Sequence, residues 1–384
     1  MKKIYLLISI VILLVSCRRH VKDALYGQCI TEELCINPHE YTSAIDSMYY
    51  TIEDIVPLDL PSSCAAFSSD KLIKKGDRYY IMDARYNRTV FVFDRNGRFL
   101  HQLGTKGHAR DEYIEGPKNF SVDDKLNVYI YERNSARLFH FDANGRCISV
   151  KRFSKCLPDN LVVTERNEYI CAFDSEGNGN GERLVVYDEN LEYKTSYMPI
   201  TGHPRLGYDN CFYEYKDYVY YRPLLSDSIV VLKKDKLDKI LKVDFNGEFI
   251  SDEIVNKAIT DIDGYSIIHA AKGVQGISRF EMTDSLIHVE YNYNGDLCHF
   301  LMDRKTGKTY NSNGFYYDGV GLQSDFTLCE ERLIYVITEE QLEWADEQRK
   351  KNNWQACYNH TPLRMRNIID RRYKAPLLVI IKPK

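Results

Sequence analysis

The chain has 384 residues, 44% of them hydrophobic, and a formal net charge of −4. This length and apolar fraction are sufficient for one or two domains with a sizeable core. The mildly acidic balance argues against a protein that binds nucleic acid by neutralising phosphate groups. Tyrosine occurs 30 times, which favours half-buried strands, since the ring packs while the hydroxyl stays hydrated.

The first residues have the organisation of a secretory signal peptide. Two lysines precede an apolar segment at residues 4–15, which is shorter than the roughly 20 residues that cross a bilayer as a helix. The segment ends in Leu-Val-Ser-Cys at residues 14–17, which resembles the bacterial lipobox. The resemblance implies that residues 1–16 are removed and that Cys17 becomes a lipidated N-terminus. The alternative is an ordinary signal peptide with an incidental cysteine.

Residues 17–46 are polar and have no clear period, so they are predicted to be a tether. The residues after Cys17 are basic rather than acidic. In lipoproteins with a similar signal, an acidic stretch at this place often marks export to the cell surface, so its absence favours an outer-membrane protein that faces the periplasm. There is no Cys-x-x-Cys pair, and Cys29 and Cys35 are the one close pair that is a candidate for a disulfide.

The clearest pattern is a repeat between residues 78 and 150. Each copy has two short apolar strands that lead into an Asp-x-Asn-Gly turn, and the turns at residues 94–97 and 142–145 are 48 residues apart. Asn and Gly suit such a turn because they tolerate a positive φ. A repeat of this length built of short strands predicts the blades of a β-propeller, each about 40–50 residues long.

The pattern continues along the chain with decreasing regularity. Six blades are predicted, the last split by a helix, at about residues 64–104, 118–153, 160–198, 208–245, 277–310 and 332–382. Helices are predicted at residues 252–259, 339–352 and about 363–372, the second behind a capping box of Thr338 and Gln341.

The sixth predicted blade is one strand short, while residues 49–58 form a spare strand at the other end of the chain. We expect that strand to close the ring, because closure removes the exposed edges of an open array. The predicted fold is an all-β, six-bladed β-propeller at residues 47–384, closed by an N-terminal strand and carrying small helical insertions in its last blades.

This organisation resembles the six-bladed β-propeller lipoproteins of Gram-negative gut anaerobes, which are relatives of the NHL-repeat propellers. The resemblance covers about residues 47–384. It rests on the Ile-Glu-Asp-Ile-Val-Pro-Leu lead-in at 52–58, the blade turn at 93–97, the connector at 104–113 and the Pro-Leu pair at 376–377. In that family the connector usually reads G-x-G-x-G-P-G-E-Y, whereas this chain has Ala-Arg-Asp in place of the Gly-Pro-Gly. If the connector serves a ligand shared by the family, the resemblance implies that this copy is altered.

The connector is the first candidate for a ligand site, because loops between blades lie at a face of a propeller. Its candidate ligand-binding residues are Lys106, His108, Arg110, Glu112 and Tyr113, and Arg88, Arg205 and Tyr208 are predicted to help line one face. The alternative is structural: the loop glycines allow the turn, Tyr113 packs between blades and Glu112 binds backbone amides.

A second candidate is a calcium loop beginning at Asp174. Asp174, Glu176 and Asn178 offer oxygen atoms at alternate positions, with Gly179 in sixth place. The twelfth position is Val185 rather than the expected Glu, and a polar hairpin explains the same composition. No other cofactor is expected.

No enzymatic motif is present, whether G-x-S-x-G, H-E-x-x-H or a P-loop. The sequence therefore favours a lipid-anchored, non-enzymatic binding or scaffolding module for a glycan, a peptide or an envelope protein, with no role in binding nucleic acid. The alternative is an enzyme with a metal in its channel, since related six-bladed propellers include lactonases and lyases. That enzyme would need acidic, Asn or His side chains from different blades to converge on the metal.

Overall fold

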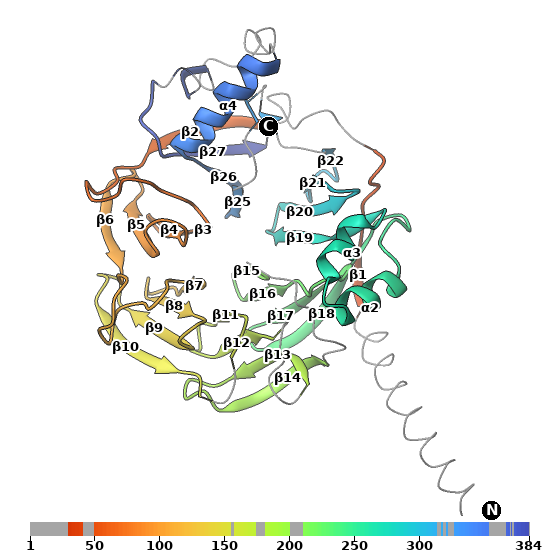
Figure 1. Cartoon of the computed structure of the whole chain (residues 1–384), viewed down its shortest axis with the longest axis horizontal. Coiled ribbons are helices and arrows are strands. Elements are labelled where there is room, and N and C mark those ends of the chain that lie inside the picture. Colours follow the sequence, from red (N-terminus) through yellow and green to blue (C-terminus); the bar gives the residue numbers. More distant parts are fainter. Residues whose placement is uncertain are drawn as a thin grey trace, which may run out of the picture.

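The computed structural model describes residues 30–40, 50–154, 157–173, 181–199, 210–312, 316–317, 320–321, 326–352, 366–368, 370 and 372–383. Six sheets, five of them with four strands and one with five, surround a common axis as the blades of a propeller (Figure 1), as the sequence predicts. Blade 1 consists of β3 (Lys71–Lys75), β4 (Arg78–Asp83), β5 (Thr89–Asp94) and β6 (Phe99–Leu103). Blade 2 consists of β7 (Asn119–Val122), β8 (Val128–Glu132), β9 (Arg137–Phe141) and β10 (Cys147–Arg152). Blade 3 consists of β11 (Asn160–Val163), β12 (Tyr169–Ala172), β13 (Glu182–Tyr187) and β14 (Tyr193–Pro199).

Blades 4 and 5 are formed by consecutive strands as well, while blade 6 takes one strand from the N-terminal part of the chain. Blade 4 has β15 (Phe212–Tyr215), β16 (Tyr218–Tyr221), β17 (Ser228–Lys233) and β18 (Lys236–Asp244). Blade 5 has β19 (Val274–Met282), β20 (Leu286–Tyr293), β21 (Asp296–Asp303) and β22 (Thr309–Ser312). Blade 6 has β25 (Phe326–Cys329), β26 (Arg332–Ile337), β27 (Leu377–Pro383) and β2 (Tyr50–Pro57). A short hairpin of β23 (Tyr316–Tyr317) and β24 (Val320–Gly321) lies between blades 5 and 6 in the sequence.

Strand β5 shows why the central strands are apolar on both sides. Val90 and Val92 pack into the core shared with blade 2, while Phe91 and Phe93 pack into the core shared with blade 6. Successive side chains of a strand point to opposite faces of the sheet. Each face of this blade meets a neighbouring blade, so an alternating apolar and polar pattern would leave polar groups unpaired in the core.

The predicted Asp-x-Asn-Gly turns are built by side-chain hydrogen bonds. Asp94 Oδ1 accepts from the backbone N–H groups of Asn96 (2.9 Å) and Arg98 (3.0 Å), and Asp142 makes the same two bonds in blade 2. Gly97 has φ +81°, and a side chain there would collide with the backbone of Pro57 at the end of β2. The first blade turn is therefore also a contact with the strand that closes the ring.

The predicted ring closure is confirmed, because β2 pairs antiparallel with β27 along its length. The register places Ile52 opposite Ile381 and Val56 opposite Leu378. Arg332 Nε donates to Glu53 Oε2 (2.7 Å) and Lys382 Nζ donates to Glu53 Oε1 (3.3 Å), so this carboxylate ties β2 to both β26 and β27.

Part of the predicted tether belongs to the folded structure. Strand β1 (Ile30–Cys35) pairs in parallel with β18 and adds a fifth strand to the outer edge of blade 4. Leu34 and Ile36 are buried in the core between blades 4 and 5, which accounts for the pairing. The two apolar residues lie in a polar context that is too short to show a period. Cys29 of the candidate disulfide lies outside the described residues.

The helices lie outside the blades. Helix α2 (Asp252–Thr260) and helix α3 (Gly264–Ala270) connect blade 4 to blade 5, and α4 (Glu339–Asn352) lies between β26 and β27. The predicted capping box is present, since Thr338 N donates to Gln341 Oε1 (2.8 Å) and Gln341 N to Thr338 Oγ1 (3.3 Å). Of the predicted helix at 363–372, residues 366–368 are described and helical. Among the described helices, none combines the length and the apolar character needed to cross a membrane.

Candidate functional site

The innermost strands of the blades line a central channel with two cavities. The hairpin-end cavity, of about 760 Å³, is lined by the turns that follow the first strand of five blades. The connector-end cavity, of about 610 Å³, lies where the first strands begin and the blade connectors enter. Leu72, Tyr213 and Thr327 line both cavities, so the two lie in succession along one channel.

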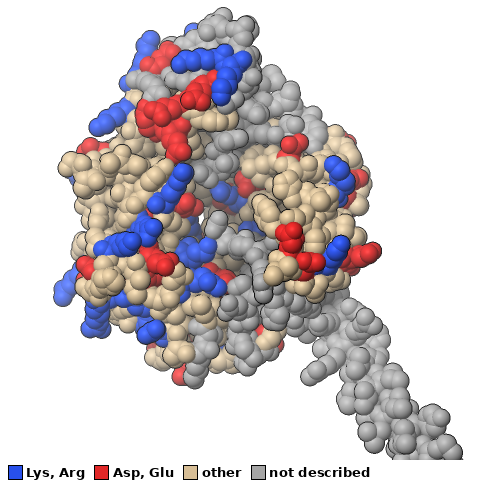
Figure 2. Space-filling view, in the orientation of Figure 1, with Lys and Arg blue, Asp and Glu red and all other residues tan. Residues whose placement is uncertain are grey.

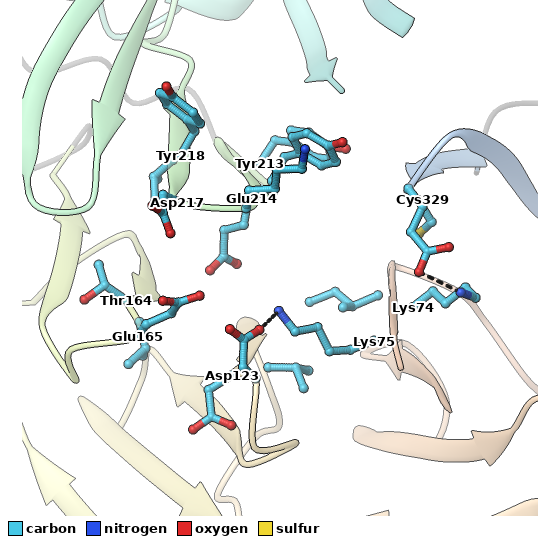
Figure 3. A pocket seen from close by; sticks show the side chains of 18 of the residues that line it. Lys74, Lys75, Asp123, Thr164, Glu165, Tyr213, Glu214, Asp217, Tyr218 and Cys329 are labelled. Carbon is cyan, nitrogen blue, oxygen red and sulfur yellow. Dashed lines mark hydrogen bonds and ion pairs between the residues drawn. The ribbon is translucent and has the colours of Figure 1, made fainter. Parts of the chain in front are cut away.

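The turns at the hairpin end bring charged residues to one mouth. Because each blade begins with the same strand and turn, equivalent turn positions converge on the axis although they are far apart in the sequence. The charged residues at these turns are Lys74 and Lys75 in blade 1, Asp123 and Asp124 in blade 2, Glu165 and Arg166 in blade 3, Lys216 and Asp217 in blade 4, and Glu330 and Glu331 in blade 6. Figure 3 shows Lys74 and Lys75 on one side of the cavity and Glu165, Glu214 and Asp217 on the other.

Three of these turns are joined by a charged chain. Lys75 forms an ion pair with Asp124, and this hydrogen bond lowers the pKa of the Asp124 carboxyl. Asp124 is in turn hydrogen-bonded to Glu165, which raises the pKa of the Glu165 carboxyl. Two carboxyl groups in contact favour the protonated form of one of them. The ion pair and the carboxyl contact link the turns of blades 1, 2 and 3 at the mouth of the channel.

Deeper in the channel, a carboxylate and an ammonium group are both removed from water. Burial raises the pKa of Glu214, whose Oε2 accepts a hydrogen bond from Ser121 Oγ (3.2 Å). Burial lowers the pKa of Lys71, whose Nζ donates to Asn119 Oδ1 and to the Phe120 carbonyl, both at 2.8 Å. The wall of the channel thus offers acceptor and donor groups of both charges.

The connector between blades 1 and 2 holds Tyr113 as a packing residue. Its ring is fully buried and meets Phe139 edge-on, with the ring centroids 4.9 Å apart, and its hydroxyl donates to the Leu103 carbonyl (2.6 Å). Gly104 has φ +71°, and a Cβ there would lie 2.6 Å from the Tyr113 ring. The glycine is required by this close approach, so these two residues have structural roles.

Glu112 also turns back into its own loop. Its carboxylate accepts from Ala109 N (2.8 Å) and lies where a side chain on Gly107 would be. Lys106, His108 and Arg110 are exposed on the same loop. None of the five candidate residues of the connector lines either channel cavity, so a ligand that contacts the exposed three would lie on the connector face outside the channel.

Arg88, which was predicted to help line one face, contacts the segment that follows the connector. The Arg88 side chain packs against Gly116, and its Nη1 donates to the Glu115 carbonyl (3.3 Å). The remaining candidates lie outside the described residues. They are the lipidation site Cys17, the ligand residues Arg205 and Tyr208, and the calcium residues Asp174, Glu176 and Asn178.

The charged turns of the hairpin-end cavity were not among the predicted site residues. A signal for them exists in the sequence, because a charged pair follows the first strand of most blades: Lys-Lys at 74–75, Asp-Asp at 123–124, Glu-Arg at 165–166 and Glu-Glu at 330–331. Each pair alone is typical of an exposed turn. The pairs become informative once the propeller fold shows that they meet at one mouth.

The hairpin-end cavity has the properties of a binding site for a polar ligand. Its volume lies within the range of about 300–1,000 Å³ that is usual for ligand pockets. Within the described residues, no group of three or more His, Cys, Asp or Glu side chains is arranged to hold a metal ion. The chemistry that the cavity does offer is hydrogen bonding and ion pairing from five blades.

Two solved structures have the same fold at low sequence identity. The structure of a candidate exported protein of Bacteroides fragilis superposes with a TM-score of 0.76 at 15% identity, covering 92% of this chain and 99% of that one. A member of the DUF4221 family from Bacteroides vulgatus superposes with a TM-score of 0.51 at 11% identity, covering 87% of this chain and 97% of that one. No curated protein matches the chain. The family model for DUF4934, described as a domain of unknown function, matches residues 47–359, and the chain therefore belongs to that family.

Proposed function

We propose that this chain is an extracytoplasmic binding module of the cell envelope, anchored by a lipid on Cys17, that holds a polar ligand in the hairpin-end cavity. The observation that carries the proposal is the convergence of charged turns from five blades on a cavity of about 760 Å³. A glycan or a peptide suits this wall, because both present several hydrogen-bonding groups to a surface that offers donors and acceptors.

The charge arrangement favours binding over a role that is only structural. Asp124 and Glu165 hold two exposed carboxyl groups in contact at an open mouth, which raises the pKa of Glu165 and which neutral side chains would avoid. A ligand that donates a hydrogen bond to this pair would relieve the contact between the two carboxyl groups. A blade junction without function would gain from apolar residues at the same positions.

The envelope location is supported by the sequence at residues 4–17, which has the apolar segment and terminal cysteine of a lipoprotein signal. The Bacteroides fragilis protein of the same fold is itself a candidate exported protein. We infer a lipoprotein propeller, related to the NHL-repeat propellers, in the outer membrane and facing the periplasm. Growth of the source organism with an alkyne-tagged fatty acid should label the wild-type chain and leave a Cys17→Ala variant unlabelled.

Ligand binding is tested on the mature chain carrying Cys17→Ser, applied to glycan and peptide arrays. A ligand identified in this way should lose affinity for a Glu165→Gln variant, since the amide removes one of the two carboxyl groups that can accept a hydrogen bond from the ligand. Glu192→Gln is the matched control, because Glu192 is an exposed residue of the same blade that lies outside the cavity. Equal loss in both variants, or binding unchanged in Glu165→Gln, would exclude the hairpin-end cavity as the site.

A further inference from the structure

The wall of the connector-end cavity is formed in part by a polar face of blade 5. Strands β19 and β20 direct their apolar residues toward blade 4, where Phe280, Val289 and Tyr291 are buried. Because side chains alternate along a strand, Glu281, His288 and Glu290 lie on the opposite face. All three are almost completely buried, and both glutamates line the cavity.

Glu281 is a fully satisfied buried carboxylate. Its Oε1 accepts from Thr327 Oγ1 (2.9 Å), and its Oε2 accepts from Leu328 N (3.0 Å) and lies 3.1 Å from His288 Nδ1. Two of these donors come from β25 of blade 6, so the carboxylate connects the two blades. Burial alone would raise the pKa of Glu281, but the hydrogen bond from His288 and the charge of Arg279 lower it below its usual value.

The two histidines next to Glu281 form a chain that ends before Glu290. His288 donates from Nδ1 to Glu281, and its Nε2 lies 3.4 Å from His299 Nδ1. Burial holds the pKa of His299 well below its usual value, so the ring is neutral. Whichever ring donates, this hydrogen bond joins His299 Nδ1 to His288 Nε2 and not to Glu290.

Glu290 Oε2 is a buried carboxylate oxygen without a hydrogen-bond donor. The residue is 7% exposed, and its Oε2 has no hydrogen-bond partner. His299 Nδ1 lies 3.8 Å from this oxygen, which is beyond hydrogen-bond distance, and Arg279 stands opposite Glu290 in the register of β19 and β20. Arg222, another residue of this cavity, donates to the carbonyl groups of Ile277 (2.6 Å) and Asn210 (2.9 Å).

We propose that Glu290 anchors a second ligand site, in which its carboxylate accepts a hydrogen bond from the ammonium group of an organic amine that enters the connector-end cavity. An ammonium group fits better than a hydroxyl group, because it supplies the missing donor to Oε2 and makes a charge-assisted hydrogen bond with the carboxylate. Phe212 and Tyr265 line the same cavity and provide aromatic surface for the carbon skeleton of the amine.

The site is open to solvent on the face that carries α3 and α4. Figure 2 shows a hollow at the centre of this face, and Tyr265, which is 71% exposed, belongs to the cavity wall. The cavity of about 610 Å³ is large enough for an amine of several carbon atoms. The hairpin-end cavity does not include Glu290, so the two sites lie at different positions along the channel.

Ethanolamine and ethylene glycol are matched probes, since they differ by an ammonium group in place of a hydroxyl group. Each is titrated calorimetrically into the mature chain at constant ionic strength. We expect ethanolamine to bind at least about tenfold more tightly than ethylene glycol, as a charge-assisted hydrogen bond should. Glu290→Gln, which keeps the shape of the side chain, should abolish that difference, while Glu214→Gln in the deeper channel should keep it.

Four outcomes would overturn the proposal, and three of them concern the wild-type chain and Glu290→Gln. These three are the absence of ethanolamine binding to the wild-type chain, equal affinity for the two probes, and a preference for ethanolamine that persists in Glu290→Gln. Circular dichroism and melting curves of each variant establish that it is folded. A loss of the preference in Glu214→Gln would place the amine at the hairpin end and would likewise contradict the assignment to Glu290.

Discussion

Blades 2 and 5 share one strand plan but use their packing faces differently. Blade 2 packs apolar side chains on both faces, with Ile130 and Phe139 toward blade 1 and Tyr131 and Leu138 toward blade 3. Blade 5 is apolar toward blade 4, whereas its other face combines Leu286 and Leu301, which join the core of blade 6, with the buried polar residues Glu281, His288, His299 and Glu290. An apolar junction is therefore enough to hold two blades together. The polar residues buried between blades 5 and 6 are not needed for that purpose, which makes them candidates for a further role in binding.

Burial of the polar face of blade 5 depends on ring closure, because blade 6 covers that face and is complete only with β2. Deleting residues 46–60 should have the largest effect of the changes considered, since it removes β2 and leaves β27 as an open edge. We expect the melting temperature to fall by more than about 10 °C or the cooperative transition to disappear. Deleting residues 18–40, which removes only the added edge strand β1, should cost clearly less; equal losses would contradict the special role of β2.

Truncation at the apolar junction should come next. Tyr113→Ala removes a fully buried ring between blades 1 and 2, and we expect a loss of about 3–5 kcal/mol in the free energy of unfolding, measured by denaturant titration. Tyr113→Phe keeps the ring and removes only the hydroxyl that donates to Leu103, so it should cost about 1–2 kcal/mol. If the two variants were equally destabilised, packing would not be what holds this junction.

The two glutamates of blade 5 should respond with opposite signs. Glu281→Gln weakens a carboxylate that accepts three hydrogen bonds, and we expect a loss of about 2–3 kcal/mol in the free energy of unfolding. Glu290→Gln removes a buried charge without a donor, so it should leave stability unchanged or raise it by about 1 kcal/mol. Destabilisation by both variants to the same extent would show that Glu290 has a stabilising partner.

The smallest effect should be in the dependence of stability on pH. Burial lowers the pKa of His299 in the folded state. As the pH falls below the usual pKa, the folded chain therefore binds fewer protons than the unfolded chain. Stability is then complete above the usual pKa of 6.5 and is lost as the pH falls below it toward the folded-state pKa. His299→Gln should therefore flatten the decline of melting temperature between pH 6.5 and lower pH.

The matched control for this slope is His140→Gln in blade 2. Burial also lowers the pKa of His140, but that ring is half-buried and stacks on Tyr129, with the centroids 4.3 Å apart. We expect the control to flatten the slope less than His299→Gln. The reverse order would mean that the polar chain of blade 5 is hydrated in solution.

The regular part of the fold was predictable because it repeats. Asp94 and Asp142 mark equivalent turns, the Thr338–Gln341 capping box marks the start of α4, and residues 49–58 supply the strand that the last blade lacks. Strand β1 was missed, because its pairing with β18 depends on two apolar residues whose partners lie 200 positions away. Local pattern carries no information about such a partner.

The channel residues were harder to predict for the same reason. Asp124 and Glu165 look like ordinary turn residues until the blades are arranged around an axis. Glu281 in β19 and Glu290 in β20 lie on the same face of blade 5. Only the neighbouring strands determine that Glu281 has three hydrogen-bond partners, whereas Glu290 Oε2 has none. Residue type and spacing predict which face a side chain occupies, whereas its partners depend on the tertiary structure.

If the chain is lipidated at Cys17, the edge strand β1 sets how far the propeller can move from the membrane. Twelve residues separate Cys17 from Ile30, and even a fully extended chain of that length reaches only about 40 Å. Without the pairing to β18, the free segment would extend to β2 at Tyr50, with a reach of about 110 Å. For a chain lipidated at Cys17, β1 therefore shortens the free linker more than twofold. It also brings the outer edge of blade 4, rather than blade 6, closest to the bilayer.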